Sequence, residues 1–153
     1  MISIASQCCT RSNKNIFVFR DKKNPQKLVL KNPKKLFIDE VIIDGCLISD
    51  DKIRCDFMFY IPNQELVYNY QYKENYIELK GSNLEHAVHQ IINTVNFFIS
   101  KYKLEKKMSR KGYIVCNRVP KADSTSQKLK LEVKKKYNMD LDIATKQHCV
   151  EIT

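Results

Sequence analysis

The spacing of hydrophobic and polar positions changes near residue 82, and this change divides the chain into a strand-rich part and a helical part. Before that point, short runs of β-branched and aromatic residues are separated by Pro, Gly, Asn and Asp, which is typical of strands and turns. Their short connections predict a mostly antiparallel meander. The predicted strands are residues 15–20, 28–30, 36–48 with a bend at Asp44-Gly45, 54–61, 65–72 and 75–80.

Residues 83–102 carry apolar side chains at helical spacing and predict an amphipathic helix. Ser82 and Glu85 match a Ser-x-x-Glu capping box at its start, and Gly81 lets the chain turn out of the sheet. Beyond this helix, the pattern predicts a strand at 112–116, a very basic helix at 125–137 and closing strands at 141–143 and 149–152. The apolar positions of the first helix are Leu84, Ala87, Val88, Ile91, Ile92, Val95, Phe98 and Ile99.

These elements predict one α/β domain over residues 1–153, with a mixed, largely antiparallel central sheet flanked by helices. No apolar run is long enough to span a bilayer, and the first residues lack a basic region followed by a sustained apolar one. A soluble, cytoplasmic protein without a membrane partner is therefore expected. The six cysteines, at positions 8, 9, 46, 55, 116 and 149, show no spacing typical of a zinc site or redox dithiol, which predicts free, mostly buried thiols.

The net charge of +10 is distributed unevenly along the chain. Residues 1–35, the predicted N-terminal strands, carry 9 Lys and Arg against one acid, whereas residues 36–100 carry 4 against 10. Residues 101–153 return to 14 against 6. An acidic core at 36–102 between basic flanks at 1–35 and 103–153 suits a cation site whose surroundings attract DNA or RNA. The same distribution also fits a lysine-rich surface that serves only solubility.

Three residues could supply phosphodiesterase chemistry. Glu78 and Lys80 are two positions apart on one predicted strand, so their side chains emerge on the same face. Asp56, on another strand of the sheet, could lie beside Glu78 if an intervening strand takes up the separation. Hydrolysis of a phosphodiester needs a hard cation near the phosphate and an activated water. Asp56 and Glu78 would hold Mg²⁺ or Mn²⁺, and Lys80 would orient or deprotonate the water and stabilise the developing charge.

Residues 54–92 resemble the PD-(D/E)xK nuclease superfamily, which includes restriction endonucleases and Holliday-junction resolvases. The match comprises Asp56 on a strand, Glu78-Leu79-Lys80-Gly81 on a later strand, and a following helix that carries Gln90. The resemblance implies a restriction-endonuclease-like core, metal ligation by Asp56 and Glu78, catalysis by Lys80 and a supporting role for Gln90. Members often carry a further acid on a helix before the first core strand. No such helix is predicted here, and Glu40, or less readily Asp44, could supply that acid.

Several of these residues also have simpler interpretations. Glu78 and Lys80 could form a surface ion pair, and Asp56 could face solvent at a strand start. Gln90 falls off the apolar stripe of its helix, so it could equally face solvent. His86 and His89 are three apart, but they lack a third zinc ligand at a fixed spacing, which favours a polar helix surface. The basic helix, with Lys128, Lys134 and Lys135, is either a phosphate-contacting face or a solvated one.

The expected function is a Mg²⁺- or Mn²⁺-dependent nuclease, with DNA favoured over RNA as its partner. The alternatives are a non-catalytic nucleic-acid-binding module on the same fold, and an interaction or inhibitor protein that binds an acidic partner. Cleavage of both strands of a duplex would favour a homodimer, although nothing in the sequence requires one.

Overall fold

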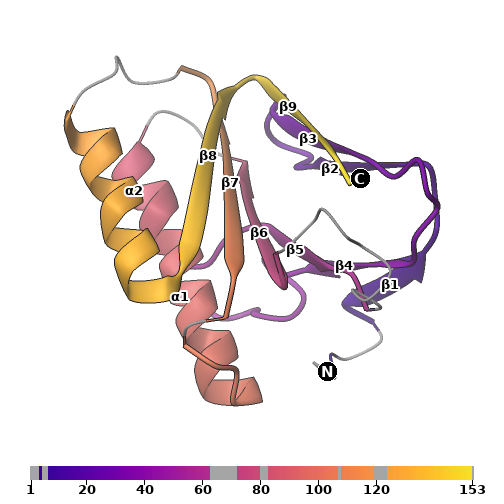
Figure 1. The fold of residues 1–153 in the computed structure, drawn as a ribbon, viewed down its shortest axis with the longest axis horizontal. Helices are drawn as coiled ribbons and strands as arrows, with labels where there is room; N and C mark the ends of the chain where they lie inside the picture. Colours follow the sequence, from indigo (N-terminus) through magenta and orange to yellow (C-terminus); the bar gives the residue numbers. More distant parts are fainter. Residues whose placement is uncertain are drawn as a thin grey trace.

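The computed structural model describes residues 4, 7–62, 72–79, 83–106, 108–118 and 124–152 (Figure 1). It contains nine strands and two helices within these residues. In chain order they are β1 (Cys9–Ser12), β2 (Ile16–Arg20), β3 (Lys27–Lys31), β4 (Ile38–Ile42), β5 (Phe57–Tyr60), β6 (Glu74–Leu79), α1 (Leu84–Tyr102), β7 (Arg110–Cys116), α2 (Ser124–Tyr137), β8 (Met139–Thr145) and β9 (Gln147–Glu151).

The central feature is a six-stranded mixed sheet in the order β1-β4-β5-β6-β7-β8. β1, β4, β5 and β6 pair antiparallel, whereas β6, β7 and β8 are parallel. Parallel neighbours need a crossover, which α1 supplies between β6 and β7 and α2 between β7 and β8. Both helices pack on one face of the sheet, where Val95 of α1 and Val133 of α2 share a core with Tyr76 of β6. We call this core the helix-side core.

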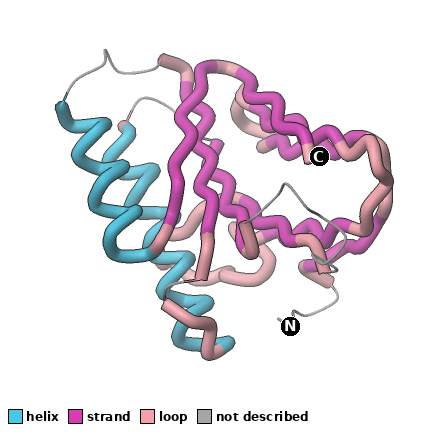
Figure 2. The backbone as a smooth tube through the Cα atoms, viewed as in Figure 1, coloured by secondary structure: helices cyan, strands magenta, loops and turns pink. Residues whose placement is uncertain are grey.

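The opposite face is covered by a second sheet, in the order β2-β3-β9 (Figure 2). β2 alternates strictly, with Phe17 and Phe19 buried and Ile16 and Val18 exposed. The buried side chains pack with Ile77 of β6 in a second core, the sheet-side core. The fold is therefore α/β with a mixed sheet, as predicted, but its helices lie on one face only. A small sheet covers the other face.

Most predicted elements are present, and the differences concern the region of the expected site. β1 was not predicted, and β5 begins at Phe57, so Asp56 precedes the strand rather than lying on it. The predicted strand at 65–72 falls almost entirely on residues 63–71, outside the described part of the chain. β5 and β6 pair directly, so no strand lies between them in the sheet.

The start of α1 also differs from the prediction. Asn83 is the N-cap, and its side chain accepts the His86 N–H at 3.0 Å, so the predicted capping box based on Ser82 is wrong. Asn is as good an N-cap as Ser, and sequence alone did not choose between neighbours. As expected, no helix precedes α1 within the residues that the structure describes.

The prediction of free thiols is wrong for two of the six cysteines. Cys8 and Cys46 form a disulfide with a sequence separation of 38 residues. The cause is the pairing of β1 with β4: the Ile42 N–H donates to the Cys8 carbonyl at 2.9 Å, which brings Cys8 beside the turn after β4. Cys55 and Cys116 are free and buried, as predicted, whereas Cys149 is free and exposed.

A buried ion pair lies at the start of β6 and β7. The Arg110 Nε and Glu74 Oε2 atoms are 3.2 Å apart, and both side chains are almost completely buried. The Arg110 guanidinium also donates to the carbonyls of Glu105, Lys106 and Tyr137 at 2.6 to 3.0 Å. Arg110 thus joins the segment before β7 to the end of α2 and satisfies carbonyls that a helix end leaves open.

Candidate metal centre

Asp56 and Glu78 are brought together by the pairing of β5 with β6. The register ends with Phe57 opposite Ile77, and Asp56 directly precedes this pair. The Asp56 N–H donates to the Ile77 carbonyl at 3.1 Å, and the Asp56 Oδ2 accepts the Leu79 N–H at 2.8 Å. These two hydrogen bonds hold Asp56 against the residues on either side of Glu78.

The electrostatics of Cys55 agree with this proximity. Burial raises the pKa of the Cys55 thiol, a hydrogen bond with Thr94 lowers it, and the carboxylates of Glu78 and Asp56 each raise it further. Both carboxyl groups therefore lie near the same buried thiol.

Glu78 is completely buried, whereas Asp56 is partly exposed. Alternation along β6 puts Glu78 on the same face as Tyr76, which belongs to the helix-side core. A buried carboxylate is costly unless a cation or hydrogen bonds compensate it. The predicted catalytic residue Lys80 lies outside the described residues.

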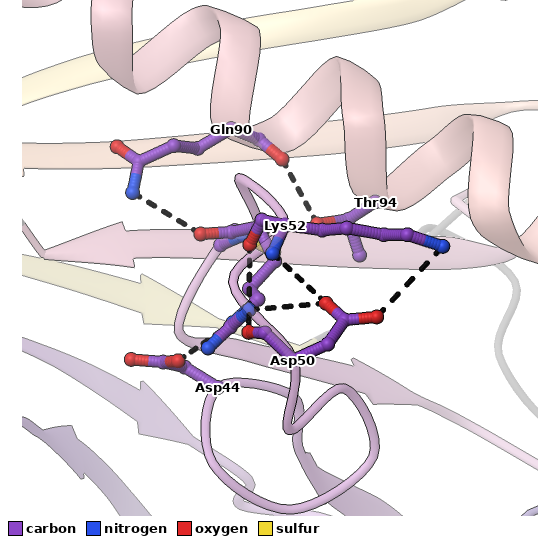
Figure 3. Close-up of polar contacts among 7 residues, drawn as sticks. Asp44, Asp50, Lys52, Gln90 and Thr94 are labelled. Carbon is purple, nitrogen blue, oxygen red and sulfur yellow. Dashed lines mark hydrogen bonds and ion pairs between the residues drawn. The ribbon is translucent and has the colours of Figure 1, made fainter.

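The segment before Asp56 is fixed to α1 by two polar side chains. The Gln90 Nε2 atom donates to the Arg54 carbonyl at 3.1 Å, and the Thr94 Oγ1 atom accepts the Cys55 N–H at 2.9 Å. Figure 3 shows both side chains reaching from α1 toward this segment. Gln90 is 6% exposed and Thr94 is fully buried, so the side of α1 beside the apolar stripe does not face solvent. Gln90 acts here through the backbone that leads into Asp56.

The turn after β4 supports Asp56 from the other direction. The N–H groups of Ile43 and Asp44 donate to the Asp56 carbonyl at 3.0 and 3.3 Å. The Asp44 carboxylate accepts from the Arg54 Nε at 2.8 Å, and Arg54 also contacts Asp50 (Figure 3). Gly45 has φ +79°, as the predicted Asp-Gly bend requires. Asp44 is therefore close to Asp56, but its carboxylate is engaged by Arg54.

Glu40 is not brought to this place. Residues 38–41 of β4 are all buried or partly buried, and their side chains divide between two cores: Val41 belongs to the helix-side core and Ile38 to the sheet-side core. Glu40 alternates with Ile38 on the sheet-side face, where its Oε2 lies 3.3 Å from the Lys14 Nζ. It therefore lies on the opposite face of the sheet from Glu78.

The two histidines of α1 and the predicted phosphate-contacting lysines of α2 lie on the helices. His86 lines a pocket of about 210 Å³ beside Gln90 and Arg54, whereas His89 lines a separate pocket between α1 and α2. Lys128 and Lys135 are exposed on α2. The Lys134 Nζ lies 2.9 Å from the Asp140 Oδ1 at the start of β8.

The predicted cation site has Asp56 and Glu78 as its two carboxylates. In the part of the chain that the structure describes, no group of three or more His, Cys, Asp or Glu side chains is placed to hold a metal ion. The protein would then supply two carboxylates, Asp56 and Glu78. Mg²⁺ is usually held in this way, through one or two carboxylates, several waters and the phosphate of the substrate.

Sequence reasoning missed two residues that position the segment around Asp56, Arg54 and Thr94. Thr94 could have been noticed, because it lies four residues from Gln90 and both point from α1 in the same direction.

Comparisons with family models, curated proteins and solved structures found no match. Among the described residues, no helix is both long enough and apolar enough to span a membrane.

Proposed function

We propose that this protein is a Mg²⁺- or Mn²⁺-dependent nuclease of the PD-(D/E)xK type, with DNA as the favoured substrate. The observation that carries the proposal is that Asp56 hydrogen-bonds to the backbone of Ile77 and Leu79, the two neighbours of Glu78 on β6. The order of elements also supports it: a strand led by Asp56, a strand that carries Glu78, and a helix whose Gln90 contacts the segment before Asp56.

The position in the sheet is suitable for a ligand site. Glu78 lies at the carboxyl end of β6, and in open α/β sheets ligands bind outside the carboxyl ends of the strands. The sheet also changes at β6 from antiparallel to parallel pairing. The loops and helix starts at this edge can therefore be shaped around a substrate without disturbing either core.

Each residue has a defined part in the proposed reaction. Asp56 and Glu78 would hold the cation, which when bound polarises the phosphate and its attacking water. Asp56 keeps its orientation through the Leu79 N–H. Lys80 would orient the water, accept its proton or stabilise the charge on the phosphate oxygens. Gln90 and Thr94 hold the backbone of Arg54 and Cys55, and so they act as positioning residues.

The test is cleavage of duplex, single-stranded and branched DNA, and of RNA, with Mg²⁺, Mn²⁺ or a chelator. Glu78→Gln and Lys80→Ala should each reduce cleavage roughly 100-fold or more, the scale seen when one charge-stabilising group is lost. Glu85→Gln is the matched control, because it removes the same charge from an exposed position in the first turn of α1. Calorimetric titration with Mn²⁺ should show binding to the wild type and to Glu85→Gln, and weaker binding to Glu78→Gln.

Failure to cleave any of these substrates with either metal would overturn the nuclease proposal. If the inactive protein still bound nucleic acid at low salt, the non-catalytic binding module would be the better interpretation. Loss of both cleavage and binding would favour a protein that interacts with an acidic partner.

A further inference from the structure

A cluster of basic side chains lies at the carboxyl ends of β7 and β8, away from the basic helix predicted to contact phosphate. The turn of the β2-β3 hairpin, residues 21–26, reaches this edge. The Lys27 N–H donates to the Lys146 carbonyl at 3.3 Å, and the Lys146 N–H donates to the Cys116 carbonyl at 2.9 Å. A side-chain hydrogen bond between Gln26 and Asn117 adds a second connection. These contacts join the hairpin turn to the last residues of β7 and to the β8-β9 turn.

Six cations gather on these segments, and we call them the hairpin-end cluster. All but the partly buried Lys27 are exposed. Asp21 is the acid of the hairpin turn, and its carboxylate accepts the Lys23 N–H at 3.2 Å and the Asn24 side chain at 3.1 Å. None of the six lies within 4 Å of a carboxylate in the described part of the chain. The cluster consists of Arg20, Lys22, Lys23, Lys27, Arg118 and Lys146.

The direction of the strands places this cluster at the same edge as Glu78. The register aligns Leu79 with Val115 and Val115 with Ala144, so β6, β7 and β8 end together. In Figure 1 the same edge is where α1, α2 and β9 begin. Glu78 faces the helices and the hairpin covers the other face. A strand of nucleic acid that touches both must therefore cross the carboxyl edge of the sheet.

The last turn of α2 lies at the other end. α2 runs back toward the start of β8, and the ion pair between Lys134 and Asp140 marks that end. A 14-residue helix is about 21 Å long, so Lys134 and Lys135 lie far from the edge that carries Glu78. Lys134 is also already paired with a carboxylate, whereas the described residues give the hairpin-end cluster no such pair.

We propose that the hairpin-end cluster binds the sugar-phosphate backbone of a nucleic acid and guides it across the carboxyl edge of the sheet to the metal centre. This inference rests on the proposed nuclease function for its substrate class. The contacts read charge and not base sequence, so the binding is sequence-tolerant and strongly dependent on salt.

The test compares two triple variants with the same loss of charge. One is Lys22→Gln/Lys23→Gln/Lys27→Gln, and the control in the last turn of α2 is Lys134→Gln/Lys135→Gln/Lys136→Gln. Binding of a fluorescein-labelled DNA duplex is followed by anisotropy in a chelator at several salt concentrations, after thermal melting has shown both variants to be folded. Each phosphate contact contributes about 0.9 to the slope of log K against log salt, which is about eightfold in affinity at 0.1 M salt.

The hairpin variant should lower that slope by about 2 to 3, whereas the α2 control should lower it by less than about 1. With Mg²⁺ the hairpin variant should raise KM and leave kcat unchanged. An equal effect of the two variants, or no effect of the hairpin variant, would overturn the inference, even if cleavage persists. If the protein cleaves nothing but the hairpin variant still loses binding, the proposed nuclease function fails and the hairpin-end cluster stands as a binding surface.

Discussion

Thr94 provides the sharpest test of how the segment before Asp56 is held. It is completely buried, and its Oγ1 atom accepts the Cys55 N–H at 2.9 Å and donates to the Gln90 carbonyl at 2.9 Å. Thr94→Val keeps the shape of the side chain but leaves the buried Cys55 N–H without this acceptor. An unsatisfied buried group costs about 1 to 3 kcal/mol, and the added methyl group returns about 0.8 kcal/mol. The expected net loss in the free energy of unfolding is about 1 to 2 kcal/mol.

Two measurements check this expectation. Urea unfolding should give the loss directly, and thermal melting should show a decrease of about 2 to 4 °C for each kcal/mol in a chain of this size. Thr94→Ser is the control, since it keeps the hydroxyl and removes only a methyl group. Amide hydrogen exchange separates the two variants: the Cys55 amide should exchange about tenfold or more faster in Thr94→Val only. An unchanged Cys55 exchange rate in Thr94→Val would refute the reasoning, whatever the total stability.

Three further predictions concern carboxylates and their partners. Asp56→Asn should weaken Mn²⁺ binding in calorimetry but keep near-wild-type stability, because the amide oxygen can still accept the Leu79 N–H. Asp56→Ala should lose about 1.5 to 3 kcal/mol of the free energy of unfolding in urea. Equal stability of the two variants would contradict this expectation. Burial raises the pKa of Glu74 above its ordinary value, although Arg110 and Tyr76 act to lower it, so the folded protein holds this proton more tightly than the unfolded chain. The contribution of Glu74 to stability is then fully present below its ordinary pKa of 4.5 and is lost as pH rises through the raised folded pKa. Urea unfolding from pH 4 to 8 should show this decline for the wild type relative to Glu74→Gln. Parallel plots of unfolding free energy against pH for the two proteins would argue against it. Arg110→Met should lower the free energy of unfolding in urea by about 3 to 5 kcal/mol, because it leaves Glu74 buried without its cationic partner. The double variant with Glu74→Gln should recover part of that loss. A double variant that recovers nothing would speak against the buried pair.

The parts of the fold that sequence predicts are those where local pattern and tertiary burial agree. β2 alternates because one face packs on the large sheet and the other is exposed, and α1 has a clear apolar stripe facing β6 and β7. In both elements the periodic pattern identifies the side that the structure buries.

The candidate site was predicted less completely, because its geometry depends on contacts between distant segments. The contacts of Asp56 with Ile77 and Leu79 depend on the register of β5 and β6, which the composition of the two strands does not specify. Gln90 was left ambiguous because a loop, not the sheet, covers that side of α1. Glu40 was proposed as the further acid from the family pattern, and the largely buried strand β4 did not show which face it occupies.

Because of the Cys8–Cys46 disulfide, the stability of the protein depends on whether its environment is oxidising or reducing. Closing a loop across a separation of 38 residues reduces the entropy of the unfolded chain by an amount worth about 4 kcal/mol in the chain-entropy model. That amount is comparable to a large part of the total stability of an ordinary domain. The bridge is attached to the turn whose N–H groups hold the Asp56 carbonyl. In a compartment that keeps thiols reduced, the chain must fold without this cross-link, and the turn beside Asp56 is then held by its backbone hydrogen bonds and by Arg54.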